Sequence, residues 1–285
     1  RLAKLAGSAG CSRRMITRYA PSPTGPLHLG HAYSAMLAHD MARAAGGTFL
    51  LRIEDIDQLR SLPVWEKQIY DDLQWLGLTW SDPVMRQSDR LPSYKKALEK
   101  LSKKGLIYPC TCSRSDVKRA ASAPQEGVFP MGPDGIIYPG TCRGKKQVGK
   151  FKLHENLRCD MSAVGEFVTD EVVFEETGEN AGTITTDPQT LAAETGDFVV
   201  SRKHMFTSYH LSVVVDDAAQ KISHVVRGAD IQDATPIHVL LQKLLQLPTP
   251  IYHHHKLIRD ETGKRLAKRD DARAISKYRA EGATP

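Results

Sequence analysis

The chain has 285 residues, enough for about two domains, and carries 39 Lys and Arg against 33 Asp and Glu, a formal net charge of +6. Its 41% hydrophobic and 25% charged residues are typical of a globular enzyme. No apolar run approaches the roughly 18 residues of a transmembrane helix, so we expect no membrane partner. The basic balance is compatible with a phosphate-bearing partner but does not require one. Five cysteines, an odd and clustered set, argue against a secreted disulfide framework and favour a cytoplasmic location.

The start of the chain is basic and irregular. Residues 1–14 contain no acidic residue and lack the apolar centre of a secretory signal peptide. A fragment of an organelle transit peptide is one interpretation, but we favour an N-terminal appendage, because a regular pattern begins at Met15.

Strands and helices alternate over the first third of the chain. "MITRYA" (15–20) and "TFLLRI" (48–53) are expected strands, the second dense enough in apolar residues for a buried parallel strand. Three helices are expected, each closed by glycine: 32–45, 63–76 and 93–104, the last with Ser93 as N-cap. This alternation predicts an α/β fold with a Rossmann-like parallel sheet.

The alternation stops near residue 107 and resumes near residue 196. Three strand-like runs then follow, "DFVVSR" (197–202), "LSVVVDD" (211–217) and "ISHVVRG" (222–228), and a helix begins with Thr235 as N-cap and Pro236 at its first position. We therefore expect a catalytic domain in two halves, with a smaller inserted domain and a C-terminal segment. The expected boundaries are 15–106, 107–195, 196–250 and 251–285.

The segment "APSPTGPLHLGH" (20–31) joins the first strand to the first helix. A ligand site is expected there, because ligands bind at the carboxyl ends of parallel strands and helix N-termini attract phosphate. His28 and His31 could donate to the same anion, and Gly30 would permit close approach. A structured turn without a ligand and a metal-binding site are the alternatives. The metal-binding site is disfavoured because no further ligands lie nearby in sequence.

The longer string "RYAPSPTGPLHLGH" (18–31) resembles the signature of class I aminoacyl-tRNA synthetases, specifically the branch that activates glutamate. The resemblance extends from Met15 over nearly the whole chain. It implies that His28, Gly30 and His31 bind ATP, and that the two histidines stabilise the transition state of adenylate formation. ATP and Mg²⁺ would be required.

A basic loop late in the chain fits the same family. "RLAKR" (265–269) stands where the family has its "KMSKS" loop, and Lys268 matches the second lysine of that motif. Cations are needed there because negative charge develops on the pyrophosphate. Arg265 replaces the usual first lysine and keeps its charge, whereas Ala267 replaces a serine and loses a hydroxyl. Lys268 is therefore expected to be catalytic and Arg265 to bind ATP.

The amino-acid site can be derived from charge. Arg18 and Arg227 end two expected strands and could bind carboxylates, and Glu54 ends another and could receive an ammonium group. The resemblance implies a glutamate site that adds further residues to these three: Ala20, Ser22 and Tyr209. Taken singly, each charged residue could instead form a surface ion pair, and Tyr209 could be an aromatic at a strand edge.

The cysteines suggest one structural zinc ion. Three cysteines lie within 33 residues, Cys110, Cys112 and Cys142, and this spacing supports a zinc site. The resemblance implies the ligand set Cys110, Cys112, Tyr138 and Cys142. The segment between Cys112 and Tyr138 is longer than expected, so His154 is an alternative fourth ligand; Cys11 and Cys159 are expected to be bystanders.

Consecutive histidines, His253–His255, precede the basic loop. Neighbouring residues on a strand face opposite sides, so these three cannot all converge on one metal. We expect them to lead into the basic loop, with one near ATP.

The C-terminal region influences the predicted function. Sixteen residues follow Arg269, and no anticodon-binding domain is expected among them. With the resemblance, this points to the glutamyl-queuosine tRNA(Asp) synthetase family, which joins L-glutamate to the queuosine base at the wobble position. The expected partners are L-glutamate, ATP and queuosine-containing tRNA(Asp), bound by a monomer, with phosphates contacted by the basic residues 143–150. The alternatives are the catalytic part of a glutamyl-tRNA synthetase that charges a tRNA 3′ end, and an inactive RNA-binding relative.

Overall fold

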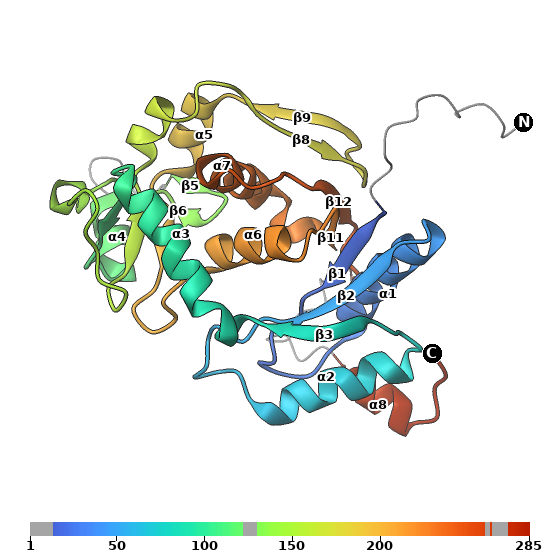
Figure 1. Ribbon diagram of the computed structural model, residues 1–285. Coiled ribbons are helices and arrows are strands. Elements are labelled where there is room, and N and C mark those ends of the chain that lie inside the picture. Colours follow the sequence, from blue (N-terminus) through green and yellow to red (C-terminus); the bar gives the residue numbers. More distant parts are fainter. Residues whose placement is uncertain (1–13, 122–129, 260–262, 264–272) are drawn as a thin grey trace, which may run out of the picture.

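The computed structural model describes residues 14–121, 130–259, 263 and 273–285 (Figure 1). None of the helices in this part of the chain has the length and apolar character that a membrane crossing needs.

The first half of the α/β unit is a three-stranded parallel sheet in the order β1-β2-β3. Its elements in chain order are β1 (Ile16–Tyr19), α1 (Leu29–Ala44), β2 (Thr48–Ile53), α2 (Pro63–Trp75) and β3 (Ser81–Arg86). The expected strands are confirmed, and so are the first two helices. Helix α1 begins three residues earlier than expected, so the Pro/Gly segment is shorter and its last residues form the first turn of the helix.

A second, four-stranded sheet has the order β11-β12-β8-β9. Its strands are β8 (Val172–Glu176), β9 (Gly182–Thr186), β11 (His224–Gly228) and β12 (Ile251–His255). Strands β8, β12 and β11 are parallel, and β9 is antiparallel to β8. Strand β11 lies beside β1, where the amide of Ser223 donates to the carbonyl of Ile16 (3.0 Å). The carboxyl ends of β1, β2 and β11 therefore meet at one edge.

Residues 107–201 also form smaller sheets away from that edge. The strands are β4 (Ile107–Pro109), β7 (Leu157–Cys159) and β10 (Val199–Ser201), in the order β10-β7-β4, and a separate hairpin of β5 (Met131–Gly132) and β6 (Gly135–Ile136). Helices α4 (Arg114–Ala121) and α5 (Pro188–Thr195) belong to the same region. At Gly132 an added Cβ would lie 2.4 Å from the carbonyl oxygen of Glu194, so the hairpin packs closely against the end of α5.

Three helices fill the centre of the molecule in Figure 1: α3 (Leu91–Lys103), α6 (Tyr209–Ala219) and α7 (Thr235–Leu245). Their apolar side chains share one core with β7, β8 and β10. Helix α3 begins at Leu91 rather than at Ser93, after a 3₁₀ helix over Gln87–Arg90. Likewise α7 starts at Thr235 with Ala234 as N-cap, after a 3₁₀ helix over Ala229–Ala234.

The strand expected at 211–217 is wrong, because these residues lie within α6. Ser208 caps this helix by accepting a hydrogen bond from the amide of Leu211 (3.3 Å). The helix is buried on most sides, so its apolar residues do not show the one-sided spacing that identifies a surface helix. A buried helix segment and a buried strand cannot be distinguished by periodicity.

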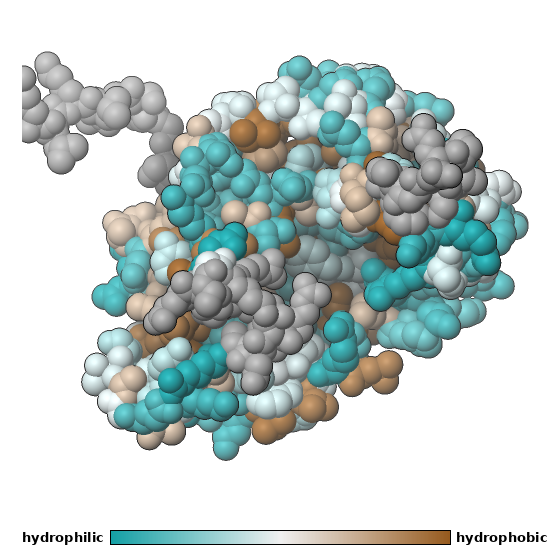
Figure 2. Space-filling view, turned by 180° about the vertical axis from the view of Figure 1, so that it is seen from behind, coloured by the Kyte–Doolittle hydropathy of each residue, from teal (hydrophilic) through white to brown (hydrophobic). Residues whose placement is uncertain are grey.

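The remaining described elements are two 3₁₀ helices, Arg143–Lys145 and Met161–Glu166, and a short helix α8 (Ile275–Ala280). Helix α8 lies beside α2, where Gln68 donates to Ser276 (2.9 Å) (Figure 1). Hydrophilic and hydrophobic residues are interspersed on the face seen from behind, so no single large apolar patch dominates it (Figure 2).

Candidate functional site

A pocket of about 540 Å³ opens at the carboxyl ends of β1, β2 and β11. We call it the strand-end pocket. It brings together all six residues predicted to bind glutamate and one of the two motif histidines. Those lining it are Arg18, Ala20, Ser22, His31, Glu54, Tyr209 and Arg227. The expectation that separate strand ends converge on one crevice is therefore confirmed.

The two motif histidines build the start of α1. His28 is the N-cap, and its Nδ1 accepts from the amide of Gly30 (3.1 Å), while Nδ1 of His31 accepts from the amide of His28 (3.1 Å). The rings lie 3.8 Å apart between centroids. An added Cβ at Gly30 would lie 3.0 Å from the His28 ring, so this glycine leaves room for the ring. His31 lines the strand-end pocket, whereas His28 is 8% exposed and is not among the lining residues.

On one side of the pocket, arginines and carboxylates form a buried cluster. Asp217 accepts from Nε of Arg18 (2.9 Å) and from Nη1 of Arg52 (2.7 Å), and Arg52 also donates to Glu54 (3.3 Å). The four residues are each at most 8% exposed. Their charges are two positive and two negative, so this cluster is neutral within itself when all four are ionised.

Burial and charge act in opposite directions on the two carboxylates. Burial raises the pKa of Glu54 above its usual value, although Arg52 and Arg18 act to lower it. Burial also acts to raise the pKa of Asp217, but Arg18 and Arg52 outweigh it and the net pKa is lowered. Asp217 is thus the fixed anion of the cluster, and Glu54 is the carboxylate that a substrate cation would stabilise.

On the other side of the pocket, Arg227 has a different environment. Its Nε donates to Nε2 of His254 (3.0 Å), its Nη1 to Nδ1 of His238 (3.0 Å) and its Nη2 to the hydroxyl of Thr235 (2.7 Å). Within the described residues, no carboxylate lies close enough to form an ion pair with it. A buried guanidinium without a direct anionic partner is suited to bind an anionic ligand.

The histidines around Arg227 are held neutral. Burial and the Arg227 charge lower the pKa of His254 to about 4, against the opposing effect of Glu176. The same two causes place the pKa of His238 well below its usual value. Burial also raises the pKa of Tyr209, so its hydroxyl stays protonated as a neutral donor in the pocket.

A second pocket of about 520 Å³ adjoins the first and shares Ser22, Glu54 and Tyr209 with it. We call it the hairpin pocket, because Asp134 at the turn between β5 and β6 lines its far side. The two pockets form a path from the β5–β6 hairpin to the ends of the central strands.

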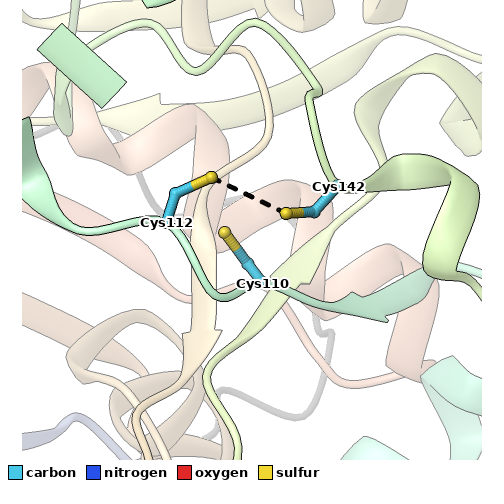
Figure 3. A group of neighbouring side chains, drawn as sticks. All are labelled: Cys110, Cys112 and Cys142. Carbon is cyan, nitrogen blue, oxygen red and sulfur yellow. Dashed lines mark hydrogen bonds between the residues drawn. The ribbon is translucent and has the colours of Figure 1, made fainter. Parts of the chain in front are cut away.

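The three cysteines predicted to bind zinc converge at the end of β4. Cys110, Cys112 and Cys142 point toward one another (Figure 3), with all three sulfur atoms within 4.8 Å of each other. The Tyr138 hydroxyl lies 3.5 Å from the sulfur of Cys110 and 3.3 Å from that of Cys112. Burial raises the pKa of the Cys142 thiol, but hydrogen bonds from Tyr138 and from the backbone of Thr111 outweigh it and bring this pKa to about 6.

The donor set fits a tetrahedral zinc site. Zinc–sulfur bonds of about 2.3 Å place sulfur atoms ~3.8 Å apart in a tetrahedron, and the Cys112–Cys142 sulfur distance is 3.6 Å. The phenol oxygen of Tyr138 is within 3.5 Å of two of these sulfur atoms, so it is close enough to be a fourth donor. His154 is exposed and does not belong to the cysteine group, while Cys159 is buried in the main core. Cys11 lies outside the described residues.

The consecutive histidines occupy β12. Of the three, His254 contacts Arg227, His255 bonds to Ser34 on α1 (2.6 Å), and His253 bonds to Thr177 (3.0 Å). They do not converge, as expected from strand geometry. The basic loop with Arg265, Ala267 and Lys268 lies outside the described residues.

Several residues of the site were not found from the sequence. They are Arg52, Asp217, Glu176 and His238, together with the contact of His254, which was singled out only as one of three consecutive histidines expected to include one near ATP. A signal existed for Arg52, because an arginine inside a buried six-residue strand requires a buried partner. For the other four, the partners come from β8, α6, α7 and β12, and no spacing in the sequence relates these elements.

Comparisons with known proteins agree with this geometry. Residues 14–285 match the family "tRNA synthetases class I (E and Q), catalytic domain". The chain is 62% identical over 274 residues to a glutamyl-Q tRNA(Asp) synthetase of Rhodobacter capsulatus, covering 95% of this chain and 97% of that one. A protein of the same name from Geobacter sulfurreducens is 41% identical, covering 92% and 78%.

Solved structures give the same fold. A glutamate tRNA ligase of Elizabethkingia meningosepticum in complex with its amino acid superposes with a TM-score of 0.71 at 26% identity. A glutamate-tRNA synthetase of Elizabethkingia anophelis gives 0.72 at 25%. Each match covers 91% of this chain but only 53% of the solved one, so the chain spans about half the length of those enzymes.

Proposed function

The chain belongs to the glutamyl-Q tRNA(Asp) synthetase family of class I synthetases, and from this premise we propose that it activates L-glutamate with ATP and transfers it to queuosine in tRNA(Asp). The observation that carries the proposal is the strand-end pocket. It holds a carboxylate, a buried arginine without a direct anionic partner, and the N-terminus of α1 at one edge of the sheet. These are the groups that an amino acid and a triphosphate require.

Glutamate is bound by charge complementarity. Arg227 takes one carboxylate, because its cation has only neutral partners among the described residues. Arg18 lines the same pocket and takes the other, although Asp217 shares its charge. Glu54 receives the α-ammonium, which restores the ionisation that burial disfavours. The Tyr209 hydroxyl is a neutral donor to either carboxylate.

ATP binds at the start of α1. The dipole of a helix N-terminus favours phosphate oxygens. His31 lines the pocket there, and the capping pair with His28 fixes the orientation of both rings. We propose that these histidines, Lys268 and Arg265 stabilise charge on the phosphates with Mg²⁺. The attacking carboxylate then displaces pyrophosphate and forms glutamyl-adenylate.

The hairpin pocket is the proposed entrance for the nucleoside. It opens onto the strand-end pocket through shared residues and is bordered by the region 107–195 that we propose to hold the tRNA stem. A hydroxyl of queuosine attacks the acyl carbon, and AMP leaves. No covalent enzyme intermediate is needed, because positioning and a good leaving group suffice.

One structural Zn²⁺ is proposed at Cys110, Cys112, Cys142 and Tyr138. It would hold the end of β4 against the loop that contains Cys142. Metal analysis tests this assignment: we expect one zinc per chain, weakened retention in Tyr138→Phe, and unchanged retention in His154→Ala. Full zinc retention in Tyr138→Phe together with zinc loss in His154→Ala would mean that His154, not Tyr138, is the fourth ligand.

A second candidate function is charging of a tRNA 3′ end. The likeness to two glutamate-tRNA ligases favours it, whereas the 97% coverage of the Rhodobacter protein favours the queuosine acceptor. The deciding experiment is to locate labelled glutamate on tRNA(Asp) with and without queuosine. We expect label at the wobble nucleotide and none on tRNA lacking queuosine. Equal labelling of both tRNAs at the 3′ end would reject the first proposal.

A further inference from the structure

Two chains of hydrogen bonds lead away from the Arg227 guanidinium. The shorter chain runs from Nε to Nε2 of His254 (3.0 Å) and from His254 Nδ1 to Glu176 (2.5 Å). The longer chain passes through two rings. Nη1 bonds to Nδ1 of His238 (3.0 Å) and His238 Nε2 bonds to Nδ1 of His210 (3.1 Å), and Nε2 of His210 lies in ion-pair range of Oδ1 of Asp134 (3.3 Å).

The direction of every bond in the longer chain follows from Arg227. A guanidinium can only donate, so Nδ1 of His238 must accept and its proton must sit on Nε2. That proton is donated to Nδ1 of His210, so His210 also carries its proton on Nε2, the atom nearest to the Asp134 carboxylate. One tautomer of each ring therefore satisfies both hydrogen bonds and the contact with Asp134.

Asp134 is the last residue of the longer chain of contacts from Arg227. It lies in the turn between β5 and β6, its side chain is 35% exposed, and it lines the hairpin pocket. His238 is buried, and His210 follows Tyr209 at the start of α6. A carboxylate at the wall of one pocket is thus connected through two rings to the cation of the other.

Resting on the glutamate site proposed above, we propose that Asp134, His210 and His238 are positioning residues that orient the Arg227 guanidinium for the substrate carboxylate. Without an acceptor at position 134, the proton of His210 can lie on Nδ1 instead, where it faces the proton on Nε2 of His238 and their hydrogen bond is lost. If the proton of His238 then shifts to Nδ1, it faces the N–H of Arg227 Nη1, and that hydrogen bond is lost as well. The position of the β5–β6 turn therefore affects the orientation of Arg227 in the proposed glutamate site.

The test uses glutamate-dependent exchange of pyrophosphate into ATP by the full chain, without tRNA. In Asp134→Ala we expect the KM for glutamate to rise about three- to tenfold, the scale of one net hydrogen bond, with kcat within about twofold and the KM for ATP unchanged. Asp134→Asn keeps the acceptor oxygen and should restore the KM. Met131→Ala is the matched control, because Met131 is exposed on the same hairpin.

A double-mutant cycle distinguishes an effect through the longer chain of hydrogen bonds from a local structural effect. His210→Phe keeps a ring but removes its hydrogen bonds, so Asp134→Ala should not raise the KM for glutamate further in that background. An equal KM increase from Asp134→Ala in both backgrounds would overturn the proposal, as would an equal increase in Asp134→Asn and Asp134→Ala. If the wild-type chain shows no glutamate-dependent exchange, the proposed function fails instead.

Discussion

Arg18 and Arg227 end adjacent strands and are buried to a similar degree, 4% and 6% exposed, but their partners differ in charge. Arg18 is paired with Asp217, which also binds Arg52. Arg227 donates only to two imidazoles and a hydroxyl among the described residues. One arginine is paired with a carboxylate of the protein itself, whereas the other has only neutral direct partners.

This difference separates stability from binding within one pocket. Removing an anion from the Arg18 side leaves buried cations without a counter-charge, which is costly to the fold. Removal of Arg227 leaves its direct partners neutral, so the fold should be less affected while the proposed ligand loses its partner. Variants on the two sides should therefore affect different measurements.

The largest effect is expected for Asp217→Ala. Two buried guanidinium groups lose their shared anion, and the free energy of unfolding should fall by about 3–5 kcal/mol, the scale for breaking a buried pair. Urea unfolding measures this change. Glu179→Ala is the control, because its pair with Lys256 is exposed on both sides and should contribute little. A similar small loss in both variants would mean that the Arg18 side is not held by charge.

Arg227→Ala should mainly weaken glutamate binding. We expect the KM for glutamate to rise about 10²-fold, the scale of truncating one partner of a buried charge pair, while the unfolding midpoint changes less than in Asp217→Ala. Arg227→Lys keeps the charge but loses the planar fork, so its KM for glutamate should lie between those of wild type and Arg227→Ala. The comparison fails if Arg227→Ala unfolds more readily than Asp217→Ala.

The sequence predicted the charged residues at the strand ends of this pocket, but not the buried aspartate on a helix that pairs with one of them. Arg18, Glu54 and Arg227 were expected to meet because parallel strands end at a common edge, and they do line one pocket. Asp217 was missed, since its run of valines suggested a strand and the structure places it on α6. A buried helix has no polar face from which its period can be recognised.

The histidines show a similar division. His28 and His31 were identified from a local motif, but their capping bonds at the start of α1 depend on three-dimensional geometry. His238 and His254 reach Arg227 only because α7 and β12 pack beside β11. Such contacts depend on long-range packing, which residue spacing does not encode.

A smaller effect is expected for Glu54→Gln. The change keeps the size of the side chain but removes the charge proposed to bind the ammonium, so the KM for glutamate should rise about tenfold, the scale of a charged hydrogen bond. Glutarate lacks the ammonium group, so its inhibition constant should be equal for wild type and Glu54→Gln. In Arg227→Ala, glutarate should bind weakly. Tighter glutarate binding in Glu54→Gln would place a ligand carboxylate, not the ammonium, near this residue, because loss of the Glu54 charge would relieve a repulsion.

The smallest effect is the pH dependence conferred by His254. Its pKa is lowered from 6.5 to about 4 by burial and by Arg227. Between these values the unfolded chain binds a proton that the folded chain excludes, so this contribution is complete above pH 6.5 and is lost as pH falls toward 4. His254→Gln should therefore show a shallower loss of unfolding free energy between pH 7 and pH 5 than wild type. His253→Gln is the control, because this neighbour faces the other side of β12, toward Thr177. Equal slopes for wild type and His254→Gln would show that the ring is not held neutral, and that the partners of Arg227 are not as different from those of Arg18 as the contacts indicate.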